Sequence, residues 1–549
     1  MIPYGHQNID QTDIKEVIKV LRSDWLTQGP KVFEFEKALA EYCGVKYAVA
    51  VNNGTAALHL AYLAAGLKAG DEVITAPNTF AATSNMLLTA GAKPVFCDIR
   101  LDTYNIDEAK IEKLISGKTR VIAPVDFSGQ PCALDQIKKI AKKYKLTVVE
   151  DACHALGAKY KNKKIGSLSD MTVFSFHPVK SITTGEGGAV LTNSKKYCEK
   201  LKLLRNHGMY KDKYNKNVMI ALGHNYRLAD IQAALGVSQL KRLDSFIKKR
   251  RQVVEWYKRE LRDVKEIILP EEIKDNYSAW HIYVIRTVNL KERDRLAEYL
   301  KNKGVAVNFH YPAVYAQPYY RKNGYKAVKL ENEEIYQASC LTLPCYAGLT
   351  EKQVKFISGL IKKYFKIYKN KLFENKESRG LIMGERVYLR KLTPADASND
   401  YCAWLNDKEV NKYLETRKCT LAELKKYLKE KSSKIDCLLV GIFDKKNDSH
   451  IGNIKLEPID RREKKAVYGI LIGDKNYWGK GIGEEATKLI IAHAFKKLGL
   501  TSLELGVISQ NKKAVKLYKK LKFKIKKIEK RAINHNGVFY DKIIMSIKK

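Results

Sequence analysis

Three motifs between residues 150 and 188 decide the fold: EDACH (150–154), SFHPVK (175–180) and GEGG (185–188). The first places Asp151 at the end of the apolar run LTVVED, the second supplies Lys180, and the third is a glycine cluster. Chemistry with pyridoxal 5'-phosphate (PLP) needs these residue types. A carboxylate pairs with the pyridinium nitrogen, and a lysine amine forms a Schiff base with the aldehyde. The three motifs therefore predict one PLP site that contains Asp151 and Lys180.

Apolar runs and amphipathic helical runs alternate around these motifs. The runs that read as strands are KYAVAV (46–51), DEVITA (71–76), PVFCDI (94–99), RVIAPV (120–125), LTVVED (146–151) and MTVFSF (171–176). Such alternation predicts an α/β fold in which helices cover both faces of a mostly parallel sheet.

The chain has 549 residues, which is too long for one ordinary core. The charged segment 365–380 ends in glycine and reads as the tail of a helix followed by a linker. A new strand pattern begins at GERVYLRKLTP (384–394), and no internal repeat is visible. We therefore expect a first domain over residues 1–368, a linker over 369–383 and a different domain over 384–549.

The composition suits a globular protein of a reducing compartment. Apolar residues make up 45% of the chain, the mean hydropathy is −0.35, and no apolar run approaches the roughly 20 residues that span a bilayer. The start MIPYGHQNID lacks the features of a signal peptide. Ten cysteines occur without a CxxC pair, so we expect free thiols, with neither disulfides nor a metal site. These observations favour a cytoplasmic protein that has no membrane partner.

A formal net charge of +40 raises the alternative of nucleic-acid binding. The lysines are spread along the whole chain, however, and no RNA-binding signature accompanies them. We interpret the charge as a lysine-rich solvated surface that attracts anionic substrates, and we expect no nucleic-acid partner.

Other candidate residues of the first domain follow its strands. NNGTAAL (52–58) leaves free amides near Thr55 at a helix start, which is a cradle for phosphate or, alternatively, an ordinary helix cap at Thr55. Phe80 follows DEVITA and is positioned either to stack on a pyridine ring or to fill the core. His154 is a neighbour of the cofactor or a satisfied core histidine.

The first domain resembles the DegT/DnrJ/EryC1/StrS family of sugar-nucleotide aminotransferases over about residues 1–368. The shared motifs also include LTQGP (26–30) and GHNYRLADIQAALG (223–236). The resemblance implies the fold type I architecture of PLP enzymes, with a small C-terminal subdomain. Its implied site residues are Lys180 bound to PLP, Asp151 at the pyridinium nitrogen, Phe80 on the ring, and phosphate contacts from Thr55, Ala56, Ser175 and from Asn225 of the partner subunit. It also implies a homodimer.

In that family, L-glutamate usually donates the amino group and a keto sugar on a nucleotide accepts it. The stretches IPYGHQNID, RSDWLTQGP (22–30) and NMLLTAGAKPVFCDI (85–99) look most like the members that aminate C4 of a UDP-linked 2-acetamido-2,6-dideoxy-4-keto hexose in the pseudaminic acid pathway. The stretch HYPAVYAQPYYR (310–321) is a candidate wall for the sugar nucleotide or, alternatively, a surface loop.

The second domain carries a glycine loop, NYWGKGIGEEATKLIIAHAF (476–495), between a strand at 466–473 and an amphipathic helix. Its amides suit a pyrophosphate. A further strand, SLELGVIS (502–509), leads into QNKKAVKLYKKLKF (510–523). There Asn511 opens a helix, and Tyr518 lies two turns later on the same face. Tyr518 taken alone also reads as an aromatic at the edge of the core.

This ordered set resembles the GNAT acetyltransferase family over about residues 384–549. The resemblance implies that loop residues Gly479, Lys480, Gly481 and Gly483 bind the pyrophosphate of acetyl-CoA, that Asn511 contacts the cofactor arm, and that Tyr518 protonates the departing thiolate. Trp478 departs from the family pattern, which has Arg or Gln there. For the general base, Glu457 and a water chain are the alternatives.

An amine made by the first domain is a natural substrate for the second. We therefore expect a bifunctional enzyme that aminates a UDP-4-keto sugar and then acetylates the new amine with acetyl-CoA. The alternatives are a bacillosamine or legionaminic acid precursor as substrate, an acetyltransferase domain that acts on protein amino termini, and a sensor or RNA-binding regulator with a PLP-enzyme fold.

Overall fold

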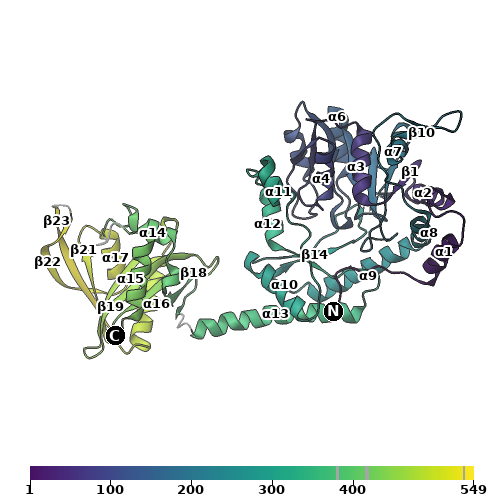
Figure 1. Ribbon diagram of the computed structural model, residues 1–549. Helices are drawn as coiled ribbons and strands as arrows, with labels where there is room; N and C mark the ends of the chain where they lie inside the picture. Colours follow the sequence, from purple (N-terminus) through teal and green to yellow (C-terminus); the bar gives the residue numbers. More distant parts are fainter. Residues whose placement is uncertain (379–381, 414–418, 536–537) are drawn as a thin grey trace. The chain divides into compact units, whose positions relative to one another are not determined.

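The computed structural model describes residues 1–378, 382–413, 419–535 and 538–549 (Figure 1). The chain forms two compact units, Met1–Lys366 and Ile367–Lys549, each built around its own large sheet. Helix α13 (Glu351–Ser378) runs through the point of division. The expected linker over 369–383 thus begins within this helix, passes through residues 379–381 outside the described part, and ends in β16 (Ile382–Met383). The domain limits themselves stay a prediction.

The first unit contains a seven-stranded sheet in the order β1-β9-β8-β5-β4-β2-β3. All strands run parallel except β9 (Gly188–Thr192), which pairs antiparallel with both of its neighbours. The parallel strands are β1 (Tyr47–Val51), β2 (Glu72–Thr75), β3 (Lys93–Phe96), β4 (Thr119–Ala123), β5 (Thr147–Asp151) and β8 (Met171–Ser175). These are the six strands predicted from the sequence.

Both faces of this sheet are buried, as expected for parallel strands between helices. Successive residues of β1 point to opposite faces of the sheet. Val49 and Val51 belong to the apolar cluster on one face, and Ala48 and Ala50 belong to the cluster on the other. The first cluster includes residues of α3 (Gly54–Ala65), α4 (Ala82–Thr89) and α7 (Lys195–Arg205). The second includes residues of α2 (Pro30–Cys43), α6 (Leu134–Tyr144), α8 (Asp230–Leu240) and α9 (Leu243–Leu261). This arrangement places the carboxyl ends of β5 and β8 beside each other.

A small antiparallel sheet completes the first unit, in agreement with the expected C-terminal subdomain. It has the order β12-β14-β15, formed by Ile267–Ile268, Tyr283–Thr287 and Cys340–Leu343. Helices α10 (Arg293–Asn302) and α13 pack on it through one apolar cluster. The remaining α-helices and strands of this unit are α1 (Gln11–Leu21), α5 (Glu108–Ile111), β6 (Lys159–Tyr160), β7 (Lys163–Lys164), β10 (Met209–Lys211), β11 (Asn217–Met219), β13 (Asn276–Tyr277), α11 (Pro318–Tyr320) and α12 (Glu331–Ser339).

The second unit is built on an eight-stranded sheet in the order β16-β17-β18-β19-β20-β21-β23-β22. Every described pair in it is antiparallel except β20 with β21. The strands after β16 are β17 (Val387–Lys391), β18 (Leu438–Asp444), β19 (His450–Asp460), β20 (Lys465–Ile472), β21 (Ser502–Ile508), β22 (Lys524–His535) and β23 (Val538–Lys548). The helices are α14 (Asn399–Asn406), α15 (Leu421–Ser433), α16 (Ile482–Lys496) and α17 (Lys512–Lys520).

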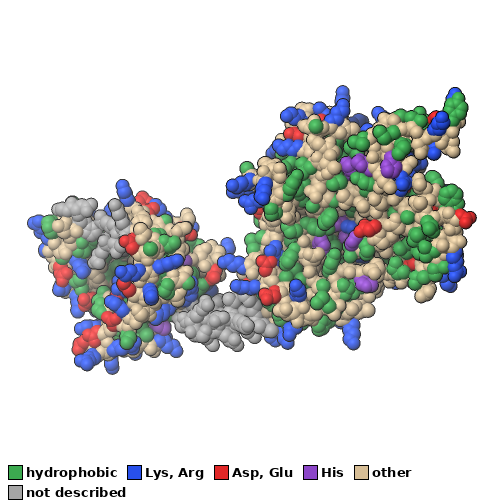
Figure 2. Space-filling view, viewed as in Figure 1, with side chains coloured by type: hydrophobic (Ala, Val, Ile, Leu, Met, Phe, Trp, Pro, Cys, Tyr) green, Lys and Arg blue, Asp and Glu red, His purple; other side chains and the backbone are tan. Residues whose placement is uncertain are grey.

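The charged surface and the cysteines can be compared with the composition. Figure 2 shows Lys and Arg side chains scattered over the visible face of the molecule, without one basic patch. All ten cysteines are free, and eight of them are buried. Within the described ranges, no helix is long and apolar enough to cross a membrane, and no His, Cys, Asp or Glu side chains group as a metal ion would require.

Candidate active sites

The carboxyl end of β5 places Asp151 in a buried position, where it is 5% exposed. One carboxylate oxygen accepts a hydrogen bond from the hydroxyl of Thr83 (2.6 Å), and the other accepts one from the N–H of Cys153 (3.2 Å). Each oxygen keeps a further lone pair. The carboxylate is therefore oriented and still able to accept a hydrogen bond from a protonated ring nitrogen.

Lys180 lies in the loop that follows β8, and its side chain is largely withdrawn from solvent. Burial lowers the pKa of its amine, and the charge of Arg250 adds to this effect. Asp151 and Cys153 act in the opposite direction, which shows that they lie near the amine. A lysine with a lowered pKa is the nucleophile that attachment to an aldehyde requires.

The amino end of α3 lies against Ser175. A Cβ atom on Gly54 would stand 2.8 Å from the Cβ of Ser175, so only glycine permits this approach. The helix cap is Asn53, whose side chain accepts the N–H of Ala56 (2.8 Å). The alternative of a cap at Thr55 is therefore wrong, because Thr55 is already in the first helical turn. The N–H of Ala56, expected at the phosphate, is engaged by this cap.

Phe80 is 61% exposed, so it does not belong to the core. Its ring approaches that of Tyr311, with centroids 6.1 Å apart. Tyr311 also reaches His154, whose Nε2 lies 3.3 Å from the tyrosine hydroxyl. The Nδ1 atom of His154 accepts the N–H of Ser128 (3.2 Å), which assigns the ring proton to Nε2. Burial, with the charge of Lys180, holds the pKa of His154 well below its usual value, so the ring is neutral.

The stretch 310–321 contains both buried and exposed residues, so it is only in part a surface loop. Tyr315 and Tyr320 pack against Phe96 of β3, while Tyr319 is exposed. Of the tyrosines in this stretch, Tyr311 is the one in contact with Phe80 and His154. It is therefore the residue through which this stretch reaches the candidate site.

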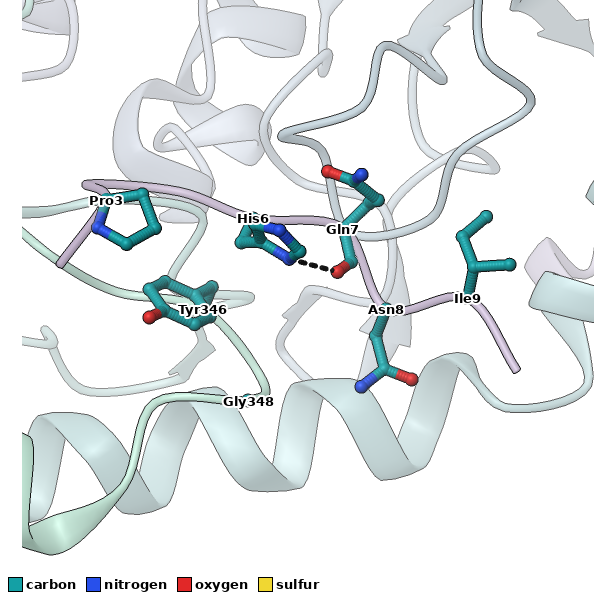
Figure 3. A pocket seen from close by; sticks show the side chains of 7 residues that line it. All are labelled: Pro3, His6, Gln7, Asn8, Ile9, Tyr346 and Gly348. Atoms are coloured by element: carbon teal, nitrogen blue, oxygen red, sulfur yellow. Dashed lines mark hydrogen bonds between the residues drawn. The ribbon is translucent and has the colours of Figure 1, made fainter. Parts of the chain in front are cut away.

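The amino-terminal segment forms part of the site region, which the sequence did not indicate. A hollow of about 520 Å³ is lined by Pro3, His6, Gln7, Asn8, Ile9, Tyr346 and Gly348 (Figure 3). His6, Gln7 and Asn8 also line a narrower cavity together with Lys180 and Arg250. The segment therefore stands between the hollow and the lysine.

Asn225 is exposed and forms a bridge with Asn206. The next residue, Tyr226, accepts the N–H of Asn52 through its carbonyl (3.0 Å). The ring of Tyr226 also stacks on His224, with centroids 4.8 Å apart. These contacts fix the backbone on both sides of Asn225 and leave its side chain at the surface.

The residues of the first unit fit PLP. The structure brings together a buried carboxylate, a lysine of lowered pKa, and a helix start that glycine keeps close to a serine hydroxyl. When bound, PLP supplies an aldehyde that captures amines and a ring that accepts electrons.

In the second unit, the glycine loop turns into α16. Gly479 (φ 73°) and Gly481 (φ 76°) have left-handed backbone conformations, and Gly481 is the N-cap of the helix. Arg386 donates to the carbonyl of Lys480 (2.7 Å) and to the carboxylate of Glu485 (2.8 Å). Arg386, the residue before β17, thus fixes the loop, and the first amides of the helix lack partners within the helix, as a pyrophosphate site requires.

Strands β20 and β21 pair only over 465–467 and 502–504, so they diverge toward the glycine loop. Polar groups of the later residues of β20 are then available to an extended ligand such as the arm of acetyl-CoA. Trp478 folds back, and its indole N–H donates to the carbonyl of Ile472 (2.9 Å). This residue therefore fixes the end of β20.

Asn511 is the N-cap of α17, and its side chain accepts the N–H of Ala514 (3.2 Å). Tyr518 on the same helix is 8% exposed and packs edge-on against Tyr468, with centroids 6.2 Å apart. Burial raises the pKa of Tyr518 to about 12, so the phenol keeps its proton at neutral pH. That is the state a general acid needs before it acts.

Glu457 is a poor candidate for the general base. Its carboxylate contacts Lys431 (2.5 Å), Lys455 (3.2 Å) and Lys434 (3.3 Å). The lysines outweigh the effect of burial and lower the pKa of Glu457 to about 2. A carboxylate this acidic holds a proton too weakly to take it from an ammonium group, which favours the alternative of a water chain.

The fold and the two sites define a PLP-dependent aminotransferase unit followed by an acetyltransferase unit. Residues 7–362 match the model of the DegT/DnrJ/EryC1/StrS aminotransferase family, and residues 386–524 match an acetyltransferase (GNAT) domain. The chain belongs to the DegT/DnrJ/EryC1/StrS aminotransferase family and also carries a GNAT domain.

Similar proteins cover the first unit. The UDP-4-amino-4,6-dideoxy-N-acetyl-beta-L-altrosamine transaminase of Campylobacter jejuni is 44% identical over 367 residues, which are 66% of this chain and 96% of the relative. Among solved structures, Helicobacter pylori PseC, an aminotransferase involved in the biosynthesis of pseudoaminic acid, has a TM-score of 0.64 at 37% identity and covers 66% of this chain and 99% of its own. The PLP form of a putative sugar aminotransferase, Spr1654 from Streptococcus pneumoniae, has a TM-score of 0.63 at 30% identity and covers 66% and 98%.

Proposed function

We propose that this protein is a bifunctional nucleotide-sugar enzyme of pseudaminic acid biosynthesis. The first unit transfers the amino group of L-glutamate to UDP-2-acetamido-2,6-dideoxy-beta-L-arabino-hexos-4-ulose. The second unit acetylates the new 4-amino group with acetyl-CoA and releases UDP-2,4-diacetamido-2,4,6-trideoxy-beta-L-altrose. The observation that carries the proposal is the presence, in one chain, of an acetyltransferase domain and a unit 44% identical to an altrosamine transaminase.

Each residue of the first unit has a role that its surroundings support. Asp151 would accept a hydrogen bond from the ring nitrogen of PLP and keep that nitrogen protonated. Lys180 would hold PLP through its Nζ atom, and as a neutral amine this Nζ would serve as the base for the α-proton of the donor. Phe80 would lie against the ring, and His154 holds Tyr311 beside Phe80. Thr55, Ser175 and Asn225 of the partner subunit bind the phosphate, whereas the N–H of Ala56 is already bonded to the side chain of Asn53.

In the second unit, the sugar amine attacks the thioester carbonyl of acetyl-CoA, a C–N bond forms and the C–S bond breaks. Tyr518 delivers its proton to the departing sulfur and regains one from solvent, which receives the proton of the amine. Gly479, Lys480, Gly481, Gly483 and Asn511 bind the coenzyme. The three lysines around Glu457 favour water over this carboxylate as the proton acceptor.

We infer that the protein is a homodimer in the cytoplasm. Exposed apolar side chains occur on α1, on the following loop, and at and just after the end of β11: Ile14, Ile18, Leu21, Trp25, Leu26, Met219, Ile220 and Leu222. Leu26 and Asp230 are joined by a backbone hydrogen bond, so the loop at 22–30 lies beside the segment that contains Asn225. A second copy on this surface would cover apolar area and receive Asn225. The free cysteines suit a reducing compartment.

Product analysis by NMR tests the proposal. The purified full chain is given PLP, L-glutamate, acetyl-CoA and the UDP-linked 4-keto sugar. We expect a 4-acetamido product of L-altro configuration. A product only from a bacillosamine or legionaminic acid precursor would contradict the substrate assignment. Acetylation of a peptide amino terminus, with none of the sugar amine, would contradict the role of the second unit.

A further inference from the structure

Arg250 of α9 is among the largest fully buried side chains of the described structure, with 2% of its surface exposed. Buried arginines ordinarily pair with carboxylates, since an isolated charge is costly to remove from water. Among the described residues, however, its hydrogen bonds go to backbone carbonyls, and no carboxylate is its partner. An apolar side chain would fill this space without the cost of burying a charge, so packing alone does not explain an arginine at position 250.

The guanidinium connects three segments that are distant in the sequence. Its Nη1 donates to the carbonyls of Cys345 (2.8 Å), His281 (2.9 Å) and Trp280 (3.4 Å). Its Nη2 approaches the carbonyls of Lys180 (3.4 Å) and Val179 (3.5 Å). The planar fork of arginine allows these contacts at once, whereas the single ammonium of a lysine does not.

One of the three segments carries the lysine to which PLP is attached. Arg250 lines the same narrow cavity as Lys180 and contributes to the lowered pKa of its amine. Arginine does not lose its proton in proteins, so this charge is fixed. Asp151 and Cys153 raise the pKa of the Lys180 amine and so favour its charged form. The permanent positive charge of Arg250 acts against them and lowers this pKa.

We propose that Arg250 is a positioning residue of the aminotransferase site: its guanidinium ties the Lys180 loop to the segments at 280–281 and 345, and its charge disfavours a second positive charge on the lysine nitrogen. The inference rests on the proposed attachment of PLP to Lys180.

The test uses the full chain loaded with PLP and three variants, R250M, R250K and R251M. Arg251 is the matched control, because it is the next residue of α9 but pairs with Glu272 (2.5 Å) and is partly exposed. The readouts are the pH midpoint of the visible absorption band of bound PLP, kcat and KM for L-glutamate, and the melting temperature.

For R250M we expect the midpoint to rise by about one pH unit and kcat to fall at least about tenfold, with little change in KM. R250K should keep the pH midpoint near the wild-type value, because lysine keeps the positive charge. Its kcat should fall, because the single ammonium group cannot make the contacts of the guanidinium. R251M should match the wild type in both.

The proposal would be overturned if R250M had the pH midpoint and the kcat of the wild type. It would also be overturned if the pH midpoint shifted as far in R251M as in R250M. If R250M does not fold, R250K decides: full kcat in this variant contradicts the positioning role, and reduced kcat with an unchanged visible band supports it. Failure of the proposed function has a different signature, namely a visible band that survives in K180A.

Discussion

The two oxygens of Asp151 have different donors, and this difference makes the carboxylate testable. Thr83 supplies a side-chain hydroxyl at 2.6 Å, whereas Cys153 supplies a backbone N–H. Removal of the hydroxyl leaves one oxygen free to turn away from the ring nitrogen.

We expect T83V to weaken PLP binding and to reduce amination about tenfold, since a hydrogen bond to a charged group contributes roughly 1.5–3 kcal/mol. Titration of the visible absorbance with PLP measures the first effect. T89V on the same helix is the control, because Thr89 is exposed and its hydroxyl donates only to the backbone. Unchanged PLP affinity in T83V would contradict the orientation of Asp151 by Thr83.

Tyr518 allows a separate prediction for the acetyltransferase step. Since burial raises the pKa of Tyr518 to about 12, the acid form is present below that pH, and it is lost only as the pH rises through it. We therefore expect that ionisation of Tyr518 causes no loss of acetylation between pH 7 and pH 10, so any loss in this range should also occur in Y518F. This variant should reduce acetylation about 100-fold and leave amination unchanged. Equal acetylation rates in Y518F and the wild type would exclude Tyr518 as the acid.

At the scale of elements, the start of α16 depends on a backbone conformation that glycine adopts without strain. We expect G479A to cost about 1 kcal/mol of stability and to raise the Kd for acetyl-CoA several-fold, because the loop amides move. Isothermal titration calorimetry measures the affinity.

Gly499 is the matched control for Gly479. It also has a left-handed conformation (φ 67°), and a Cβ at either glycine would meet open space. G499A should lose similar stability while its affinity for acetyl-CoA stays at the wild-type value. A similar loss of affinity in both variants would show that general strain, and not the loop, is responsible.

Two acidic side chains, Asp126 after β4 and Glu150 in β5, lie next to each other. They are close to the candidate site, because Glu150 directly precedes Asp151. Burial first, and then the neighbouring Glu150, raise the pKa of Asp126 well above its usual value. An acid whose pKa is higher in the folded state stabilises the fold fully below its unfolded pKa, and this contribution is lost as the pH rises toward the folded pKa.

We therefore expect the contribution of Asp126 to stability to fall as the pH rises above about 4, so that D126N gains roughly 1–3 kcal/mol relative to the wild type between low and high pH. The variant keeps the oxygen that accepts the N–H of Cys132 (2.9 Å). Melting temperatures measured from pH 4 to pH 9 test the prediction. Parallel curves for the two proteins would contradict it.

The sequence predicted those features that depend on local pattern. The six parallel strands and the start of α17 at Asn511 are confirmed, because apolar period and capping are encoded within a few residues. Strand β9 and the contacts of Thr83, Arg250 and Arg386 were missed, since each joins segments far apart in the chain. The lysines around Glu457 were missed for the same reason: two of the three lie on α15 or just beyond it.

At the scale of the whole molecule, the residues proposed for each reaction lie in a separate unit. Lys180 and Asp151 belong to the first, while Tyr518 and the glycine loop belong to the second. A change in one unit should therefore remove one reaction and leave the other intact, which a single catalytic centre does not allow.

Mass spectrometry of the sugar products from the wild type, K180A and Y518F tests the bifunctional assignment most directly. With PLP, L-glutamate and acetyl-CoA, the wild type should convert the UDP-4-keto sugar to a product heavier by about 1 Da and then by about a further 42 Da, as amination and acetylation require. K180A should form neither product from the ketone but should acetylate a supplied 4-amino sugar, and Y518F should accumulate the amine. Failure of the wild type to acetylate the amine that it forms, or loss of both reactions in each variant, would contradict two independent sites acting in sequence.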